Sequence, residues 1–295
     1  MRVHTPGRGL PDELVDLILA EDVLKRADHG RCALVSRSFG KVAHDKLYEH
    51  ARLTITDVRP DDATSLGDVS ATSTDEWRRL GLLSVRSSVR ALSVDFIDDD
   101  DHFRYANENE VPEPSNVALD RGALARIIAD LPILVELNIV WAHYIVARPD
   151  LDLGNLERLR SLSMNRFRQS IIASAPNLDQ LVLPLYLEEF TPTAPSPRRL
   201  RKLTVSGIDS RLDLAALVAR LEWLAPPSLE VLEMPLASTS ATLLLIWLER
   251  HVGREHSLRE VKLDGDEAPQ WSAADRTALR KLGEQHGFRV LGPGL

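Results

Sequence analysis

The chain of 295 residues contains a single cysteine and no long apolar run. Because Cys32 has no partner within the chain, an intrachain disulfide is excluded, which fits a reducing compartment. No stretch approaches the roughly 18 consecutive apolar residues of a membrane-spanning helix, and the first ten residues lack the apolar segment of a signal peptide. We therefore expect a cytoplasmic protein, a nuclear protein or one found in both compartments, with no membrane partner.

The sequence also lacks the charge and the motifs of several functional classes. Its formal net charge is -8 at pH 7, whereas nucleic-acid-binding proteins carry a basic patch or stripe, so we expect no nucleic-acid partner. The P-loop, the GxGxxG loop, the GxSxG nucleophile and the HExxH and CxxC metal motifs are absent. The acidic run Asp98–His102 lacks the spacing of a calcium loop. We therefore expect no catalytic residue, no metal and no cofactor, and a protein that is not an enzyme.

What the sequence has in abundance is a recurring leucine pattern. Seven stretches have the form LxxLxL with aliphatic residues at the marked positions, and a shorter eighth follows near the end. The stretches are Val89–Val94, Leu134–Ile139, Leu159–Met164, Leu178–Leu183, Leu200–Val205, Leu229–Met234, Leu258–Leu263 and Phe288–Leu291. Their first positions are separated by 45, 25, 19, 22, 29, 29 and 30 residues. All but the first interval lie close to the period of a leucine-rich repeat, which is about 20–29 residues.

Helical patterns lie between several of these stretches. Apolar residues three and four apart predict helices over Leu124–Leu131, Leu214–Leu224, Ala241–Val252 and Ala273–Gly287. A short strand followed by a helix cannot bury its apolar face alone, but stacked units form a parallel sheet inside and helices outside. We therefore predict an α/β solenoid with an inner parallel sheet and outer helices. A doubly wound α/β sheet is the alternative that fits the same elements.

The phase of the repeat predicts which side chains are buried. The central aliphatic residues should stack as one buried ladder, and Trp141 should also belong to the core. The ladder comprises Leu137, Leu162, Leu181, Leu203, Leu232 and Val261. Two columns should form the inner face, namely Ala91, Glu136, Ser161, Gln180, Lys202, Val231 and Glu260, and Ser93, Asn138, Ser163, Val182, Thr204, Glu233 and Lys262. Because this face is mildly polar and has no aromatic platform for stacking bases or sugars, we expect a protein or peptide ligand.

The stretch from Leu10 to His50 reads as three short helices. Pro11 suits the first turn of a helix because its missing N–H would be unpaired there in any case, and Asp28 and Ser38 could cap two further helices. The apolar residues of the first helix spread beyond the arc needed to pack on one neighbour, and three such helices form a marginal core. Surplus apolar surface on so small a module indicates a partner that completes it.

The pattern "LPDELVDLIL…ALVSRSF…LY" in this stretch resembles an F-box. It contains a Leu-Pro pair followed by an acidic residue, a helix rich in Leu and Ile, and a Val-Ser-Arg triplet with an aromatic residue three positions after the serine. Phe39 stands where the family usually has Trp, and His29 stands where an aliphatic residue is expected. Together with the repeats downstream, the chain resembles the fungal F-box proteins with leucine-rich repeats.

The resemblance implies a substrate receptor of a Skp–cullin–F-box ubiquitin ligase. The F-box would dock on the Skp adaptor, and the repeats would hold a protein substrate near the conjugating enzyme, so that the chain is a non-catalytic subunit. The residues that the resemblance places against the Skp adaptor are Leu10, Pro11, Leu14, Ile18, Val35 and Phe39. The alternative is a repeat scaffold whose F-box no longer recruits a ligase.

The domain organisation that follows has four parts. Residues 1–9 form a tail, 10–50 the F-box, 51–88 a linker with an N-terminal cap region, and 89–295 the leucine-rich-repeat domain, in which 98–116 is an acidic insertion. The linker is assigned from its high content of Ser, Thr and Asp, which is typical of loops.

Aromatic residues make up only 5% of the chain, yet they recur just beyond three neighbouring strands. Phe167 and Tyr186 each follow the first leucine of their unit by eight residues, and Tyr144 lies near the same edge one unit earlier. Arg166 and Arg168 flank Phe167 and would make this edge positive, which suits an acidic or phosphorylated segment. We therefore predict that Tyr144, Phe167, Arg168 and Tyr186 bind the substrate, the alternative being that these aromatics close the core.

Overall fold

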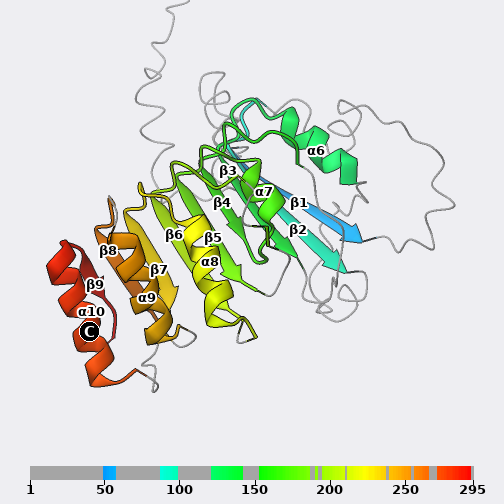
Figure 1. The fold of residues 1–295 in the computed structure, drawn as a ribbon. Coiled ribbons are helices and arrows are strands. Elements are labelled where there is room, and N and C mark those ends of the chain that lie inside the picture. The colour runs from blue at the N-terminus through cyan, green and yellow to red at the C-terminus, as the bar shows by residue number, and fades with distance from the viewer. Residues whose placement is uncertain are drawn as a thin grey trace, which may run out of the picture.

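Nine parallel strands lie side by side in the part of the chain that the structure, a computed structural model, describes (Figure 1). The described residues are 49–57, 87–98, 121–141, 153–186, 190–191, 195–209, 211–236, 239–253, 256–265 and 271–293. The strands are β1 His50–Asp57, β2 Ala91–Asp98, β3 Glu136–Trp141, β4 Ser161–Met164, β5 Gln180–Leu185, β6 Lys202–Ile208, β7 Val231–Pro235, β8 Glu260–Asp264 and β9 Arg289–Leu291.

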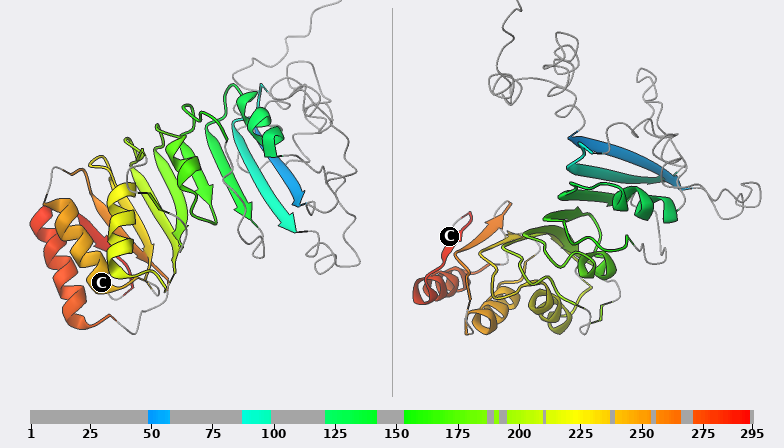
Figure 2. Two further views of the ribbon diagram at one scale, coloured as in Figure 1. Left: turned by 45° about the vertical axis from the view of Figure 1, so that its right-hand side comes forward. Right: turned by 90° about the horizontal axis from the view of Figure 1, so that it is seen from above.

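The order of the strands in the sheet is their order in the chain. Each strand pairs in parallel with the next one, from β1 at one edge to β9 at the other. A doubly wound sheet reverses its strand order at a switch point, and this sheet does not, so that alternative is wrong. Figure 2 shows the strands following a curved path with the helices along its outer side. The fold is therefore an α/β arrangement like a solenoid.

The described helices lie between the strands, as the apolar periodicity predicts. They are α6 Arg121–Ala129, α7 Gln169–Ala173, α8 Leu214–Leu224, α9 Ala241–Val252 and α10 Ala273–His286. The side chains of Asp213, Ser240 and Ser272 cap α8, α9 and α10 by accepting hydrogen bonds from backbone N–H groups of the first turn. Three predicted helices therefore have their expected bounds within one residue. The short α7 was not predicted, because five residues carry too little periodicity.

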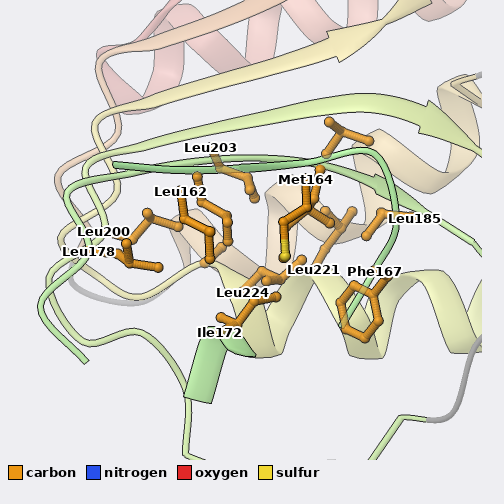
Figure 3. Close-up of a cluster of buried hydrophobic side chains, with 14 of the residues drawn as sticks. Leu162, Met164, Phe167, Ile172, Leu178, Leu185, Leu200, Leu203, Leu221 and Leu224 are labelled. Atoms are coloured by element: carbon orange, nitrogen blue, oxygen red, sulfur yellow. The ribbon is translucent and has the colours of Figure 1, made fainter. Parts of the chain in front are cut away.

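The predicted leucine ladder forms the centre of the core. Leu181 pairs with Leu162 on one side and with Leu203 on the other, and all six ladder residues are at most 2% exposed. Figure 3 shows Ile172 of α7 and Leu221 of α8 among the buried side chains beneath these strands. Trp141 is also buried, as predicted. Parallel strands in a common phase place equivalent residues next to one another, so the repeat pattern alone predicted this core.

The first strand lies N-terminal to the predicted repeat domain. β1 begins at His50, within the stretch that the sequence assigned to the F-box and the linker, and Leu53 of this strand is buried next to Val94 of β2. The alternation of Leu53, Thr54 and Ile55 is a period-two signal, but it is short and a Ser-, Thr- and Asp-rich segment follows it. The sheet therefore extends one strand beyond the predicted repeat domain.

The last strand departs from the predicted phase by one residue. Arg289 of β9 pairs with Glu260, so Phe288 stands one position later in its unit than the equivalent Leu258 does. The cause is the end of α10, where Gly287 adopts a left-handed conformation and Phe288 donates its backbone N–H to Gly283. A side chain on Gly283 would come within 2.7 Å of the Phe288 carbonyl. Helix and strand therefore meet closely there, and Phe288 is buried.

Several predictions lie outside the described residues. They are the three helices of the F-box, nearly all of the acidic insertion and the predicted substrate residue Tyr144. The predicted adaptor contacts outside the described residues are Leu10, Pro11, Leu14, Ile18, Val35 and Phe39.

Candidate protein-interaction surface

One face of the sheet carries no helix in the described ranges (Figure 2), and it is the face made by the two predicted columns. The strand register confirms the columns, since Ser161, Gln180 and Lys202 are paired in succession. Every residue of both columns is partly or fully exposed, whereas the ladder between them is buried. We call this surface the open face.

The open face has two halves that differ in charge. Over β2 to β5 the two columns contain one charged residue, Glu136, among small or uncharged side chains. Over β6 to β8 they contain four charged residues, Lys202, Glu233, Glu260 and Lys262, and Arg289 of β9 pairs next to Glu260. The charged side chains of the two columns are therefore concentrated in the second half.

Glu233 is the centre of the charged half. Its carboxylate accepts a hydrogen bond from the Thr204 hydroxyl at 2.8 Å and lies 3.0 Å from the Lys202 Nζ and 3.2 Å from the Lys262 Nζ. The Glu233 side chain is only 12% exposed. Lys262 also lies 4.0 Å from Glu260, which in turn lies 4.0 Å from Arg289. The network therefore crosses four strands, β6 to β9.

The network shifts the pKa of both central groups. Burial by itself raises the pKa of the Glu233 carboxyl, but the hydrogen bonds from Thr204, Lys202 and Lys262 outweigh burial, and the pKa lies below its ordinary value. The hydrogen bond and the charge of Glu233 raise the pKa of the Lys262 ammonium. Both groups are therefore charged at neutral pH, and the carboxylate holds two lysines close together.

We expect the variant Glu233→Gln to be less stable than the parent by about 1 kcal/mol at pH 7, because two lysines lose the carboxylate between them. The pKa of Glu233 is lower in the folded than in the unfolded chain, so its contribution is fully present above the unfolded value of about 4.3. It is lost as the pH falls through the lower folded value. Urea unfolding of parent and variant, from pH 7 downwards, should show the difference shrinking below about pH 4.

A suitable control is Glu249→Gln, because Glu249 is exposed on α9 and the charge change is the same. We expect that variant to differ from the parent by less than about 0.5 kcal/mol at pH 7. A stability difference for Glu233→Gln that stays constant across the whole pH range would contradict the described network.

Phe167 corrects the predicted substrate site. Its side chain is 0% exposed, and its ring packs edge-on against Phe190 and Trp223 with centroids 6.3 Å away in both cases. The buried Arg220 guanidinium lies 5.1 Å from the centroid of the Phe167 ring and 5.0 Å from that of Phe190. A side chain so covered cannot contact a substrate. The prediction for Phe167 is therefore wrong, and the alternative that this aromatic closes the core is right.

Two side-chain amides hold the loop that carries Phe167. The Asn165 amide exchanges two hydrogen bonds, both 2.8 Å long, with the backbone of Trp141. The Gln169 amide makes the same exchange with the backbone of Thr191, also at 2.8 Å. Each amide accepts from the N–H and donates to the carbonyl of one backbone residue, so it uses both of its hydrogen-bonding groups. The loop between β4 and α7 is therefore anchored at both ends.

Two other predicted substrate residues, Tyr186 and Arg168, differ in how exposed their side chains are. Tyr186 directly follows β5, is 40% exposed, and its hydroxyl lies near Gly207 of the next strand. Arg168 is partly buried at the start of α7. Among the described residues of the predicted set, Tyr186 is therefore the aromatic residue that a partner could reach.

Sequence reasoning placed Glu233 and its neighbours in the right columns but did not single them out. Lys202, Glu233 and Lys262 are 31 and 29 residues apart, so no local motif connects them. The available signal is the opposite charge of column neighbours in consecutive units, which becomes a contact only when the register is known.

The described residues can be compared with metal-binding and membrane-spanning proteins. Within them, no group of three or more His, Cys, Asp or Glu side chains could hold a metal ion, and no helix is long and apolar enough to cross a membrane. Comparison with protein-family models finds no matching family, and comparison with curated proteins finds no match.

Proposed function

We propose that this chain is a substrate receptor of a Skp–cullin–F-box ubiquitin ligase, with an F-box that docks on the Skp adaptor and leucine-rich repeats that bind a protein substrate. The observation that carries the binding half of the proposal is the open face, where polar side chains from seven strands stand partly or fully exposed beside a buried ladder. The ligase half rests on the Leu-Pro and Val-Ser-Arg motifs of residues 10–50.

In this role the chain acts by proximity. Binding a substrate raises the effective concentration of its lysines near the conjugating enzyme, and this requires rigid surfaces rather than catalytic groups. The parallel sheet supplies such a surface, since each strand from β2 to β8 pairs with a neighbour on both sides. Tyr186, directly after β5, and Arg168, at the start of α7, remain proposed substrate contacts, and Tyr144 joins them from the sequence.

The test of the ligase half is co-purification with a Skp adaptor. We expect the parent chain to bind the adaptor and the variant Leu10→Ala with Pro11→Ala to lose about 2 kcal/mol or more of binding free energy, as interface anchors do when truncated. The measurement is a pull-down followed by titration calorimetry with purified adaptor. Circular dichroism should show that the repeats of the variant stay folded.

The matched control is Pro132→Ala with Ile133→Ala, a proline and an aliphatic residue that are both exposed on the repeats. We expect that control to bind the adaptor like the parent. Equal binding by the Leu10 and Pro11 variant would show that these residues are not the contacts. Absence of binding by the parent itself would favour the second candidate, a repeat scaffold without a ligase role. The observation in favour of that candidate is the departure from the F-box pattern at Phe39 and His29.

A further inference from the structure

Arginine residues form a row along the N-terminal ends of the strands. Arg160, Arg201 and Arg259 directly precede β4, β6 and β8. Backbone hydrogen bonds of 2.8 to 2.9 Å join Arg160 to Asp179, Asp179 to Arg201, Arg201 to Glu230 and Glu230 to Arg259. These residues are far apart in the sequence but stand in one row. We call the arginine edge the set of Arg158, Arg160, Arg198, Arg199, Arg201 and Arg259.

The arginines of this row reach further into solvent than the acids between them. Arg201 and Arg259 lie 3.9 Å and 3.8 Å from Glu230, but their side chains are 69% and 75% exposed and that of Glu230 only 28%. The acids at this level are Glu157, Asp179 and Glu230, so six arginines stand against three carboxylates. The arginine edge is therefore a local excess of positive charge on a chain whose formal net charge is -8.

The backbone beneath the arginine edge is held in place. The Ser228 hydroxyl donates to the carbonyl of Arg198 or to that of Leu200, at 3.3 Å and 3.1 Å. Asn177 donates to the Glu157 carbonyl at 3.0 Å, and Arg160 donates to the Asn177 carbonyl at 2.9 Å. Preorganised charges bind a partner with a smaller loss of conformational entropy.

Stabilisation of the stacked repeats does not account for the whole set. Surface ion pairs contribute about 0–1 kcal/mol each, and the pairs of Glu230 join a partly exposed carboxylate to two exposed arginines at 3.8 Å and 3.9 Å. Arg198 and Arg199 are exposed, and no ion pair joins either of them to another residue in the described ranges. Two adjacent arginines without carboxylate partners are available to a ligand.

We propose that the arginine edge binds an acidic segment of the partner protein through its Asp and Glu carboxylates. Neighbouring strands are about 4.8 Å apart, so Arg160, Arg201 and Arg259 recur at roughly 10 Å. An extended peptide rises about 3.3 Å per residue, so its acidic residues should be about three positions apart. Planar guanidinium groups bind carboxylates through paired hydrogen bonds. The inference rests on one part of the proposed function, namely that the repeats bind a protein. It does not depend on the proposed ligase role.

A nucleic acid fits the same edge less well. Its phosphates recur about every 3.4 Å along each strand of a duplex, which is closer than the spacing of the arginines. Some of them would therefore face Asp179 and Glu230, which alternate with the arginines. The net charge of the chain adds repulsion at longer range.

The test measures binding of a fluorescein-labelled nonapeptide, Gly-Ser-Glu repeated three times, to the full chain by fluorescence anisotropy. We expect the parent to bind the peptide. The double variant Arg199→Glu with Arg201→Glu should bind it at least about tenfold more weakly, because two attractive contacts become repulsive. The matched control is Arg280→Glu with Lys281→Glu, the same charge change on the exposed side of α10. That control should stay within about twofold of the parent, since distant surface charges are screened by salt.

Two further probes complete the test, the same peptide with Gln in place of Glu and a single-stranded DNA nonamer. Weaker binding of the Gln peptide supports carboxylate recognition. The proposal is overturned if the parent does not bind the Glu peptide, if the Arg199 and Arg201 variant binds it like the parent, or if the DNA binds more tightly than the peptide. None of these outcomes depends on the Skp adaptor, so the result is separate from the test of the ligase role.

Discussion

The variant Leu181→Ala is expected to lose roughly 2–5 kcal/mol of unfolding free energy, the usual cost of cutting a buried leucine back to alanine. Leu181 is 0% exposed and stands in the middle of the ladder, between Leu162 and Leu203. The lost side chain leaves a space that residues of two neighbouring strands cannot fill without moving. Because each repeat supports the next, the loss should also loosen the adjacent units.

Urea unfolding followed by circular dichroism measures the loss, and hydrogen exchange of β4 and β6 measures the loosening. The control is Gln180→Ala, one residue earlier in the same strand, because the Gln180 side chain is exposed on the open face. We expect the control to change stability by less than about 0.5 kcal/mol. Equal thermal midpoints for Leu181→Ala and the parent would show that the ladder is not the core.

The variant Phe167→Ala is expected to cost about 3–5 kcal/mol, as buried phenylalanines do. The ring fills a site between Phe190 and Trp223, and the Arg220 guanidinium lies against its face. Removing the ring opens a cavity and also takes away one of the two aromatic faces that accompany a buried cation. Thermal and urea unfolding should both show the loss.

Two variants separate this structural role from a role in binding. Phe167→Leu keeps most of the apolar volume and should cost clearly less than Phe167→Ala. Tyr186→Ser removes an aromatic side chain that is 40% exposed and should leave stability within about 1 kcal/mol of the parent. An unchanged thermal midpoint for Phe167→Ala would restore Phe167 as a candidate surface residue.

The residues next to Phe167 show why its burial was not predictable from its own unit. The side chains that cover it, Phe190, Trp223 and Arg220, come from 23 to 56 residues further along the chain. The position eight residues past the first leucine of a unit lies on a loop. Its exposure is therefore decided by what the following units place above it. Tyr186, at the same position one unit later, has no such cover and is exposed.

The sequence by itself determined the repeating part of the fold. The alternation of apolar residues predicts which side of a strand is buried. Because successive units repeat the same pattern, residues at equivalent positions are predicted to be neighbours. The ladder around Leu181, the two columns of the open face and the bounds of α8 and α9 follow from these local rules. They could be predicted because a repeat needs only its immediate neighbours to bury its apolar face.

Only the tertiary structure decided what depends on distances between units. The contact of Lys202 and Lys262 with Glu233, and the row formed by Arg160, Arg201 and Arg259, join residues that are separated by 29 to 99 positions in the sequence. In the sequence these arginines are scattered among acids. In the sheet, one shared register places them at the same edge, because parallel strands all begin there. These arginines share the second position of their LxxLxL units, but their distances from one another and from Glu230 follow only from the pairing of the strands.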